Sequence, residues 1–387
     1  MADRDPPAAV RIPIARPWMD DCEAEAVRRP IGNGWVTQGP EVAAFEREFA
    51  GYVGAPHACA VSNCTSALHL ALLALGVGSH DEVVTVSHSF IATANSVRYC
   101  GATPVFVDIG PGTFNIDPLR IEAAISPRTK AILCVHQMGM PCDLSRILAI
   151  ARCHNLPAIE DAACAIGSEI LGQSGWERIG RPHGDIACFS FHPRKLVTTG
   201  DGGMLTTGSP EYDAKFRLWR QHGMSVPDSV RHSANDVIFE AYEELGFNYR
   251  LTDIQAAIGR AQLKKLPEML RSRRFLAARY GELLADIPGV RPPLEPEWAR
   301  SNWQSYCVRL PDRCDQRTIM RKMMSEGIAT RRGIMCAHRE AAYSRMPSPP
   351  LPESESAQDR CILLPIYHGL SGEDQDRVVA AFARAVG

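Results

Sequence analysis

Short apolar runs rich in β-branched residues alternate with longer stretches of helical periodicity between residues 57 and 160. The apolar runs predict strands at 57–62, 82–86, 104–108, 130–135 and 157–160, and the periodic stretches predict helices at 65–75, 91–99, 118–124 and 144–154. The strands are apolar on both sides, so both faces of their sheet must be covered. This alternation predicts a mostly parallel sheet flanked by helices, after an irregular start.

The pattern changes after residue 185. Two short strands, 186–190 and 203–206, enclose a glycine-rich loop, and a helix over 211–221 follows. A long helical pattern then covers 252–284, and four prolines within 288–296 indicate a boundary. The remaining predicted elements lie at 305–310, 316–326, 360–364 and 373–385.

The order of these elements, together with the length of 387 residues, predicts an α/β protein in three parts. We expect a large α/β domain over 1–250 with a mostly parallel central sheet, and this domain includes an N-terminal arm over 1–30. A bridging helix over 251–287 and a small C-terminal α+β domain over 288–387 complete the expected organisation.

The charges nearly balance, with 42 Lys and Arg against 44 Asp and Glu and a formal net charge of −2. Such a chain has no excess of positive charge with which to bind a polyanion. This argues against nucleic acid or a membrane surface as the partner and favours small molecules. Apolar stretches fall far short of the ~20 residues of a membrane span. The N-terminus lacks the pattern of a secretory signal, so we expect a cytoplasmic protein.

The thirteen cysteines are odd in number and include no C-x-x-C spacing. Most of them stand among apolar neighbours, where small thiols are commonly buried. We therefore expect neither a disulfide framework nor a metal site.

Small polar residues follow the first predicted strand and open an apolar helix, in the order Ser62-Asn63-Cys64-Thr65-Ser66. A helix N-terminus offers unpaired backbone N–H groups and a partial positive charge, which suit a phosphate when hydroxyl side chains stand beside them. A plain N-cap explains the same residues. The residue pattern alone leaves both readings open.

Two further features stand at the ends of buried strands. Asp161 follows Glu160 at the carboxyl end of its strand, which is where ligands bind in open α/β sheets, although it could also cap the next helix. Lys195 leaves a buried strand into a Thr/Gly-rich turn, and lysine is rarely buried unless paired. A phosphate cradle, a strand-end acid and a semi-buried amine are the parts that a pyridoxal-phosphate site requires.

Several motifs in chain order resemble those of the DegT/DnrJ/StrS-type sugar aminotransferases, which are pyridoxal-phosphate enzymes of fold type I. The motifs are GWVTQGP at 34–40, SALHLAL at 66–72, EDAA at 160–163, GDIACFSF at 184–191, GDGG at 200–203, RQHGM at 220–224, FNYRL at 247–251 and LP at 364–365. The resemblance spans nearly the whole chain. Agreement of several ordered motifs is specific, whereas any single one would be weak.

The resemblance implies roles for the residues nearest the reaction. Lys195 would hold the cofactor through a Schiff base and then move a proton between the donor α-carbon and the cofactor. Asp161 would pair with the pyridine nitrogen and keep it charged. Phe90 would stack on the ring, although an ordinary core aromatic is the alternative for this position.

The resemblance also implies how the cofactor phosphate is bound. Thr65, Ser66 and Ser190 would hold it within one chain. Asn248 and Arg250 would reach the phosphate of a neighbouring subunit, as in the paired sites of the family, which implies a homodimer.

Two departures from the family pattern lie close to this site. Cys164 stands where the family usually has Gln, so a contact to the cofactor's phenolic oxygen is changed, or Cys164 serves packing only. His192-Pro193-Arg194 replaces a commoner Tyr-Pro-Thr. The additional cation, Arg194, could bind a diphosphate, or it could pair only with an acidic group in solvent. A related dehydrating group carries His in place of the lysine, and Lys195 argues against that group.

The function implied is transfer of an amino group from L-glutamate to a nucleotide-linked keto-deoxysugar, with amination at C4 of a 4-keto-6-deoxyhexose. Both substrates use one site in turn, with pyridoxamine phosphate between the half-reactions, so ping-pong kinetics are expected. The candidates for substrate contact are Trp35, Thr37, His222 and Arg331, and a solvated basic surface remains the alternative for Arg331.

Two other functions remain open from the sequence. One keeps the fold but changes the reaction, to dehydration of a sugar or amination of a cyclic ketone that carries no nucleotide. The other is a non-catalytic sensor that uses the fold to bind a ligand. The presence of both Lys195 and Asp161 argues against a sensor, because a binding protein needs neither.

Overall fold

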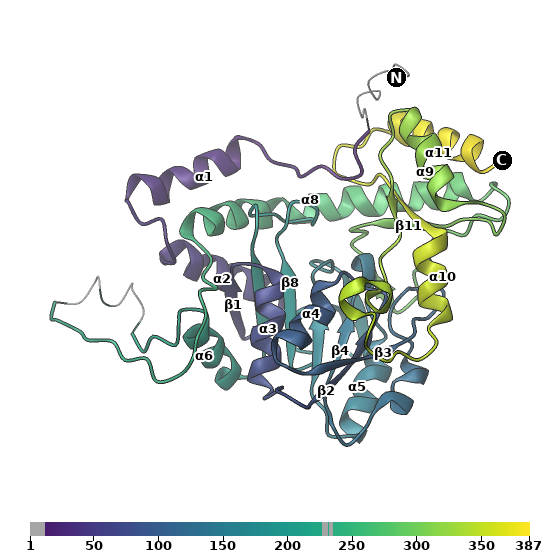
Figure 1. Ribbon diagram of the computed structural model, residues 1–387. Coiled ribbons are helices and arrows are strands. Elements are labelled where there is room, and N and C mark those ends of the chain that lie inside the picture. Colours follow the sequence, from purple (N-terminus) through teal and green to yellow (C-terminus); the bar gives the residue numbers. More distant parts are fainter. Residues whose placement is uncertain (1–11, 227–230, 232–234) are drawn as a thin grey trace, which may run out of the picture.

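The computed structural model describes residues 12–226, 231 and 235–387, and its centre is a seven-stranded sheet (Figure 1). The sheet order is β1-β9-β8-β5-β4-β2-β3. Its strands are β1 (His57–Val61), β2 (Glu82–Val86), β3 (Thr103–Val107), β4 (Thr129–Val135), β5 (Ala158–Asp161), β8 (Ile186–Ser190) and β9 (Gly203–Thr207). β9 pairs antiparallel with both β8 and β1, and the other pairs are parallel. Six strands therefore run in one direction, and their carboxyl ends share one edge.

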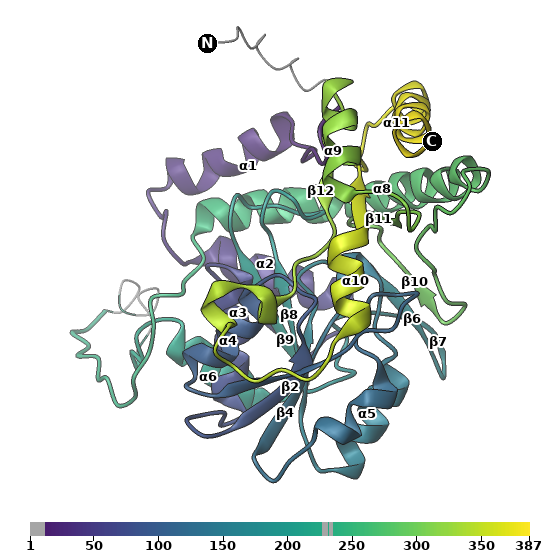
Figure 2. The ribbon, with the colours of Figure 1, turned by 45° about the vertical axis from the view of Figure 1, so that its right-hand side comes forward.

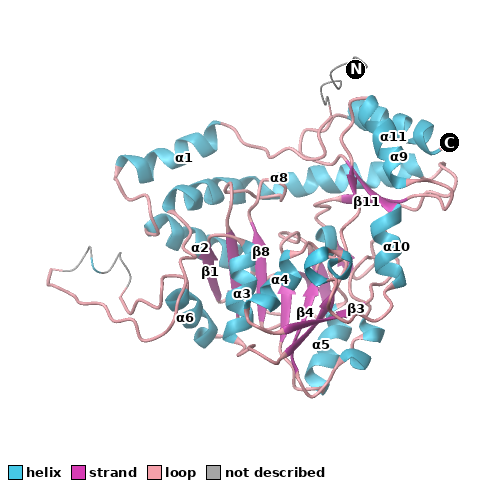
Figure 3. Cartoon of the chain, in the orientation of Figure 1, coloured by secondary structure: helices cyan, strands magenta, loops and turns pink. Residues whose placement is uncertain are grey.

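Helices cover both faces of this sheet (Figure 3). They are α2 (Pro40–Val53), α3 (Cys64–Ala74), α4 (Ala92–Tyr99), α5 (Leu144–Cys153) and α6 (Pro210–Trp219). Helix α1 (Asp21–Gly32) lies against α8 (Asp253–Leu284) instead. Neighbouring strand residues enter different cores: Leu133 packs in the core that includes residues of α3, α4 and α6, and Ile132 in the core that includes residues of α2 and α5. This period-2 alternation explains why the strands read as continuously apolar.

The long helix α8 (Asp253–Leu284) connects two cores (Figure 1). It begins with a capping box between Thr252 and Gln255. Leu263 and Leu266 pack in the core of the large sheet, whereas Leu276 and Tyr280 pack in a second core. The second core belongs to the C-terminal part of the chain.

That C-terminal part contains a three-stranded antiparallel sheet in the order β11-β13-β12 (Figure 2). Its elements are β11 (Tyr306–Arg309), α9 (Gln316–Ser325), β12 (Arg331–Arg332), α10 (Pro352–Arg360), β13 (Cys361–Leu364) and α11 (Gly372–Val386). Ile12 joins it from the other end of the chain, because its backbone hydrogen bonds with Gly327 and Ala329. The large α/β part with its mostly parallel sheet agrees with the predicted fold class, and the boundaries at 250 and 287 stay predictions.

Four segments differ from the expected elements. The start is not irregular, because α1 and α2 precede β1; Asp20 and Glu23 form a capping box on α1, and Gly54 ends α2 with φ +82°. The predicted helix 118–124 consists of two short 3₁₀ turns, the first opening at Pro118. An unpredicted hairpin, β6 (Glu169–Gly172) and β7 (Gly175–Arg178), pairs with β10 (Ala299–Arg300). Helix α10 was also not predicted.

No helix in the described part of the chain is long and apolar enough to cross a membrane. All thirteen cysteines are free thiols. Within the described ranges, no group of three or more His, Cys, Asp or Glu side chains is arranged to hold a metal ion.

Candidate active site

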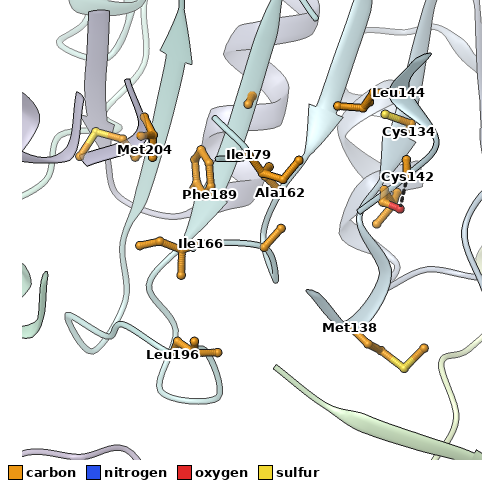
Figure 4. Packing of buried hydrophobic residues seen from close by; sticks show 14 of the residues in the cluster. Cys134, Met138, Cys142, Leu144, Ala162, Ile166, Ile179, Phe189, Leu196 and Met204 are labelled. Carbon is orange, nitrogen blue, oxygen red and sulfur yellow. Dashed lines mark hydrogen bonds between the residues drawn. The ribbon is translucent and has the colours of Figure 1, made fainter. Parts of the chain in front are cut away.

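Lys195 lies in the loop that connects β8 to β9. Its backbone N–H donates to the His192 carbonyl at 2.8 Å, which closes a tight turn. The next two residues, Leu196 and Val197, are buried, and Leu196 belongs to the core drawn in Figure 4. The loop is therefore fixed at its inner side, and Lys195 Nζ donates to Cys164 Sγ at 3.0 Å.

Burial and nearby groups act in opposite directions on the Lys195 amine. Burial lowers the pKa of Lys195, but its contact with Cys164 and the charge of Asp161 raise it, and the net pKa lies above the ordinary value. The raised pKa favours the charged form of this half-buried lysine. Cys164 directly contacts the amine that is expected to react, and a role for Cys164 in binding the cofactor stays a prediction.

Asp161 is the last residue of β5 and is 5% exposed. Its Oδ2 accepts from Thr93 Oγ1 at 2.8 Å and its Oδ1 accepts from the Ala163 N–H at 3.2 Å. Burial raises the pKa of Asp161, while these two hydrogen bonds lower it, and the net direction is upward. Because β5 is parallel to β4 and β8, Asp161 stands at the edge of the sheet from which the Lys195 loop emerges.

The N-terminus of α3 stands at the same edge, after β1. Asn63 caps the helix by accepting from the Ser66 N–H at 2.8 Å, so the plain-cap reading holds for Asn63. A Cβ on Gly203 would lie 2.5 Å from the Asn63 backbone, which explains why glycine stands where β9 passes this turn. A cavity of about 480 Å³ opens outside it, lined by Ser62, Asn63, Thr65, Ser66, Tyr99, Asp201 and Tyr249.

The other predicted cofactor residues surround these groups. Phe90 is 69% exposed, which excludes the alternative of a core aromatic and leaves its ring free to stack. Ser190, at the end of β8, is half-buried, and its Oγ accepts from the His192 N–H at 3.4 Å. Asn248 and Arg250 lie on a segment beside β1, where the Ser62 N–H donates to the Tyr249 carbonyl at 2.7 Å. Their contact with a second subunit stays a prediction.

The substrate candidates fall into two places. Trp35 and Thr37 lie in the connection between α1 and α2, and Gln38 of that connection donates to Gln221, next to His222, at 3.5 Å. Trp35, Thr37 and His222 thus belong to one neighbourhood. Arg331 is exposed on β12, opposite Leu363 of β13, and its charge acts on Arg194 in the Lys195 loop.

Three residues hold the site loops and were not found from the sequence. Asn302 Nδ2 donates to the carbonyls of Cys164 and Ile166 at 2.7 and 2.9 Å. Gln304 Nε2 donates to the Arg194 carbonyl at 2.8 Å. The third, Thr93, contacts Asp161. All three act through the fold across large sequence separations, and no local pattern marks them.

These groups fit pyridoxal phosphate. Lys195 supplies an amine for the aldehyde, buried Asp161 retains acceptor capacity for a ring nitrogen, and the cavity at α3 lies beside the hydroxyls of Thr65 and Ser66. When bound, this cofactor supplies the electron sink that makes transamination possible.

A family model for the DegT/DnrJ/EryC1/StrS aminotransferases matches residues 17–383. The chain belongs to this family. It is 40% identical over 375 residues to the GDP-perosamine synthase of Caulobacter vibrioides, covering 96% of this chain and 97% of that protein. It is 37% identical over 379 residues to the spore coat polysaccharide biosynthesis protein SpsC of Bacillus subtilis, covering 96% of each.

Solved structures agree with this assignment. The PMP form of Spr1654 from Streptococcus pneumoniae superposes with a TM-score of 0.90 at 26% identity, covering 97% of this chain and 99% of that one, and a PLP form is also among the matches. DegT/DnrJ/EryC1/StrS aminotransferases depend on pyridoxal phosphate. The predicted family, the α/β fold and the predicted class of enzyme, a pyridoxal-phosphate-dependent aminotransferase, are therefore confirmed.

Proposed function

We propose that this aminotransferase transfers the amino group of L-glutamate to a nucleotide-linked keto-deoxysugar, at C4 of a 4-keto-6-deoxyhexose, by a ping-pong mechanism in the cytoplasm. The observation that carries the proposal is the meeting of Lys195, Cys164 and Asp161 at one sheet edge, beside the cavity at α3. The name of the 40% identical GDP-perosamine synthase supports a nucleotide sugar as acceptor.

The positions of these residues support the following proposed roles. Lys195 would hold the cofactor through its amine and would carry a proton to and from the α-carbon of the donor. Asp161 would accept a hydrogen bond from the ring nitrogen, and Thr65, Ser66 and Ser190 would bind the phosphate. Phe90 would stack on the ring.

We assign the diphosphate of the acceptor to Arg194 and Arg331. In the described part of the chain, no carboxylate forms an ion pair with either guanidinium, and Arg194 Nε is buried without a hydrogen-bond partner. Burial and the charge of Arg331 both lower the pKa of Arg194, so the two cations lie close enough to repel each other. A bound dianion would relieve the repulsion and satisfy the buried donor.

We further propose a homodimer in which Asn248 and Arg250 reach the phosphate of the second subunit. Large apolar side chains stand exposed on a projection beside α6 (Figure 1), with Val237 76%, Phe239 89% and Leu245 86% exposed. Apolar groups exposed in this way are typical of a surface that another protein covers. The segment leads directly to Asn248.

The visible absorption of the holoenzyme tests the function. L-Glutamate should bleach the band of the lysine-bound cofactor, and a nucleotide-linked 4-ketosugar should restore it, with the amino sugar identified by mass and NMR. A screen of nucleotide ketosugars would define the acceptor. If glutamate leaves the band unchanged, the donor assignment is wrong, and if no nucleotide ketosugar restores it, the acceptor assignment is wrong.

A further inference from the structure

Two buried hydroxyl groups form a hydrogen-bond chain that ends on the carboxylate of Asp161. Ser89 follows β2, and its Oγ lies 2.8 Å from Thr93 Oγ1 in the first turn of α4. Thr93 Oγ1 lies 2.8 Å from Asp161 Oδ2. The exposed fractions of Ser89, Thr93 and Asp161 are 4%, 1% and 5%, so water does not compete for these hydrogen bonds.

The charge of Asp161 determines which group donates in each hydrogen bond of this chain. An ionised carboxylate only accepts hydrogen bonds, so the Thr93 hydroxyl must donate to it. The Thr93 oxygen is then the acceptor for the Ser89 hydroxyl. This polarised arrangement specifically favours the ionised form of Asp161, and the second donor strengthens the first.

The hydrogen-bond chain leaves Asp161 able to accept from a further hydrogen-bond donor. A carboxylate has about four lone-pair positions, and Thr93 and the Ala163 N–H occupy two of them, one on each oxygen. The two contacts also fix the rotation of the carboxylate about its Cβ–Cγ bond. What remains is one acceptor direction on each oxygen, in a defined plane.

We propose that Thr93 and Ser89 are positioning residues for transamination: they hold Asp161 ionised and aimed at the ring nitrogen of the cofactor. Thr93 acts by direct donation, and Ser89 acts by fixing the Thr93 hydroxyl. The inference rests on the proposed function only in taking Asp161 as the partner of that nitrogen.

Cofactor affinity tests the inference through two probes that differ only at the ring nitrogen. The apoprotein is titrated with pyridoxal phosphate and with its 1-deaza analogue, which has carbon at that position. Thr93→Val, nearly isosteric, should weaken pyridoxal-phosphate binding about 10- to 100-fold, the range for a lost hydrogen bond to a charged group. It should leave the affinity for the deaza analogue unchanged. Thr93→Ser keeps the hydroxyl and should bind both as wild type does, and Ser89→Ala should lie between.

An equal loss of affinity for both probes in Thr93→Val would mean that Thr93 only maintains the local structure, and would overturn the inference. So would a loss of the same size in Thr93→Ser. Neither result depends on which sugar is aminated, so the acceptor screen can fail while the inference stands.

The pH dependence of stability gives a readout without cofactor. Burial raises the pKa of Asp161 above its unfolded value, so its contribution to stability is present below that unfolded value and is lost as pH rises through the folded pKa. Removing the Thr93 donor, which lowers the pKa of Asp161, should raise the folded pKa further. In urea titrations of the apoprotein, the stability deficit of Thr93→Val relative to wild type should be smallest at acidic pH, where Asp161 is protonated in both proteins, and should grow as pH rises through the folded pKa. A deficit independent of pH would overturn the inference.

Discussion

The inner and outer ends of the site differ in how the single chain completes them. At the inner end, Asp161 is buried, and its carboxylate and the Lys195 amine both contact side chains of the same chain. At the outer end, Tyr99 lines the open cavity at α3 and is 58% exposed, and Phe90 is 69% exposed. The fold therefore holds the Asp161 carboxylate and the Lys195 amine in place within one chain, at a cost in buried charge, and leaves the outer end open to solvent.

The largest expected effect is at the inner end. Lys195→Ala should abolish the visible cofactor band and reduce turnover by about 10²- to 10⁴-fold or more, because it removes the proton carrier as well as the covalent attachment. Thermal unfolding of the apoprotein should remain cooperative, since Leu196 and Val197 still anchor the loop. Lys195→Arg is the matched control: it keeps the cation and should be equally inactive. Substantial turnover by either variant would contradict the assigned role.

Asp161→Asn should have the second largest effect on the rate. Loss of the carboxylate removes an interaction that can shift the pKa of a partner by 1 to 3 units, so the half-reaction with glutamate should slow by about 10- to 1000-fold. Single-turnover bleaching of the cofactor band measures this rate directly. Asp161→Glu retains the charge at an altered position and should recover part of the loss. An unchanged rate in Asp161→Asn would place the partner of the ring nitrogen elsewhere.

The same contrast explains how far the sequence could predict this site. Asp161 and Lys195 follow apolar strands, so alternation and strand-end polarity locate them, and parallel pairing explains why they meet. Thr93 and Asn302 reach the site from α4 and from a loop more than 130 residues beyond Asp161, and their side chains look like ordinary polar surface in the sequence. Local periodicity carries no information about such contacts.

The fold shows a similar division. The strands of the large sheet were predicted closely, because burial on both faces makes them long apolar runs. Helices α1 and α2 were missed although Asp20, Glu23 and Gly54 mark their ends, since their apolar residues are interrupted by charged ones that pair with other elements, such as Glu41 with Arg260. The β6–β7 hairpin is short and half-exposed, and it depends on pairing with β10.

A smaller effect is expected at the outer end. Arg194→Gln and Arg331→Gln should each raise KM for the nucleotide sugar about tenfold, the effect of losing one hydrogen bond to a charged group, with the glutamate half-reaction little changed. Arg332→Gln is the matched control, because Arg332 is the exposed neighbour on β12 and pairs with Glu340. An equal rise in KM for Arg332→Gln would mean that the effect comes from general surface charge and not from specific contacts. A slower glutamate half-reaction would mean that the two arginines bind the donor and not the nucleotide sugar.

The comparison between the inner and outer ends is tested most directly if two subunits contribute residues to one site. Asn248→Ala should lose activity, and if Asn248 serves the other subunit, mixing it with Lys195→Ala should form heterodimers with one intact site. Random assortment into symmetric dimers then restores about a quarter of the wild-type rate. Lys195→Ala mixed with Asp161→Asn is the control: both residues belong to the inner end of one chain, so no pairing rebuilds a site and no activity should return. Restoration in both mixtures would show that the inner end is also shared, and restoration in neither would confine Asn248 to its own chain.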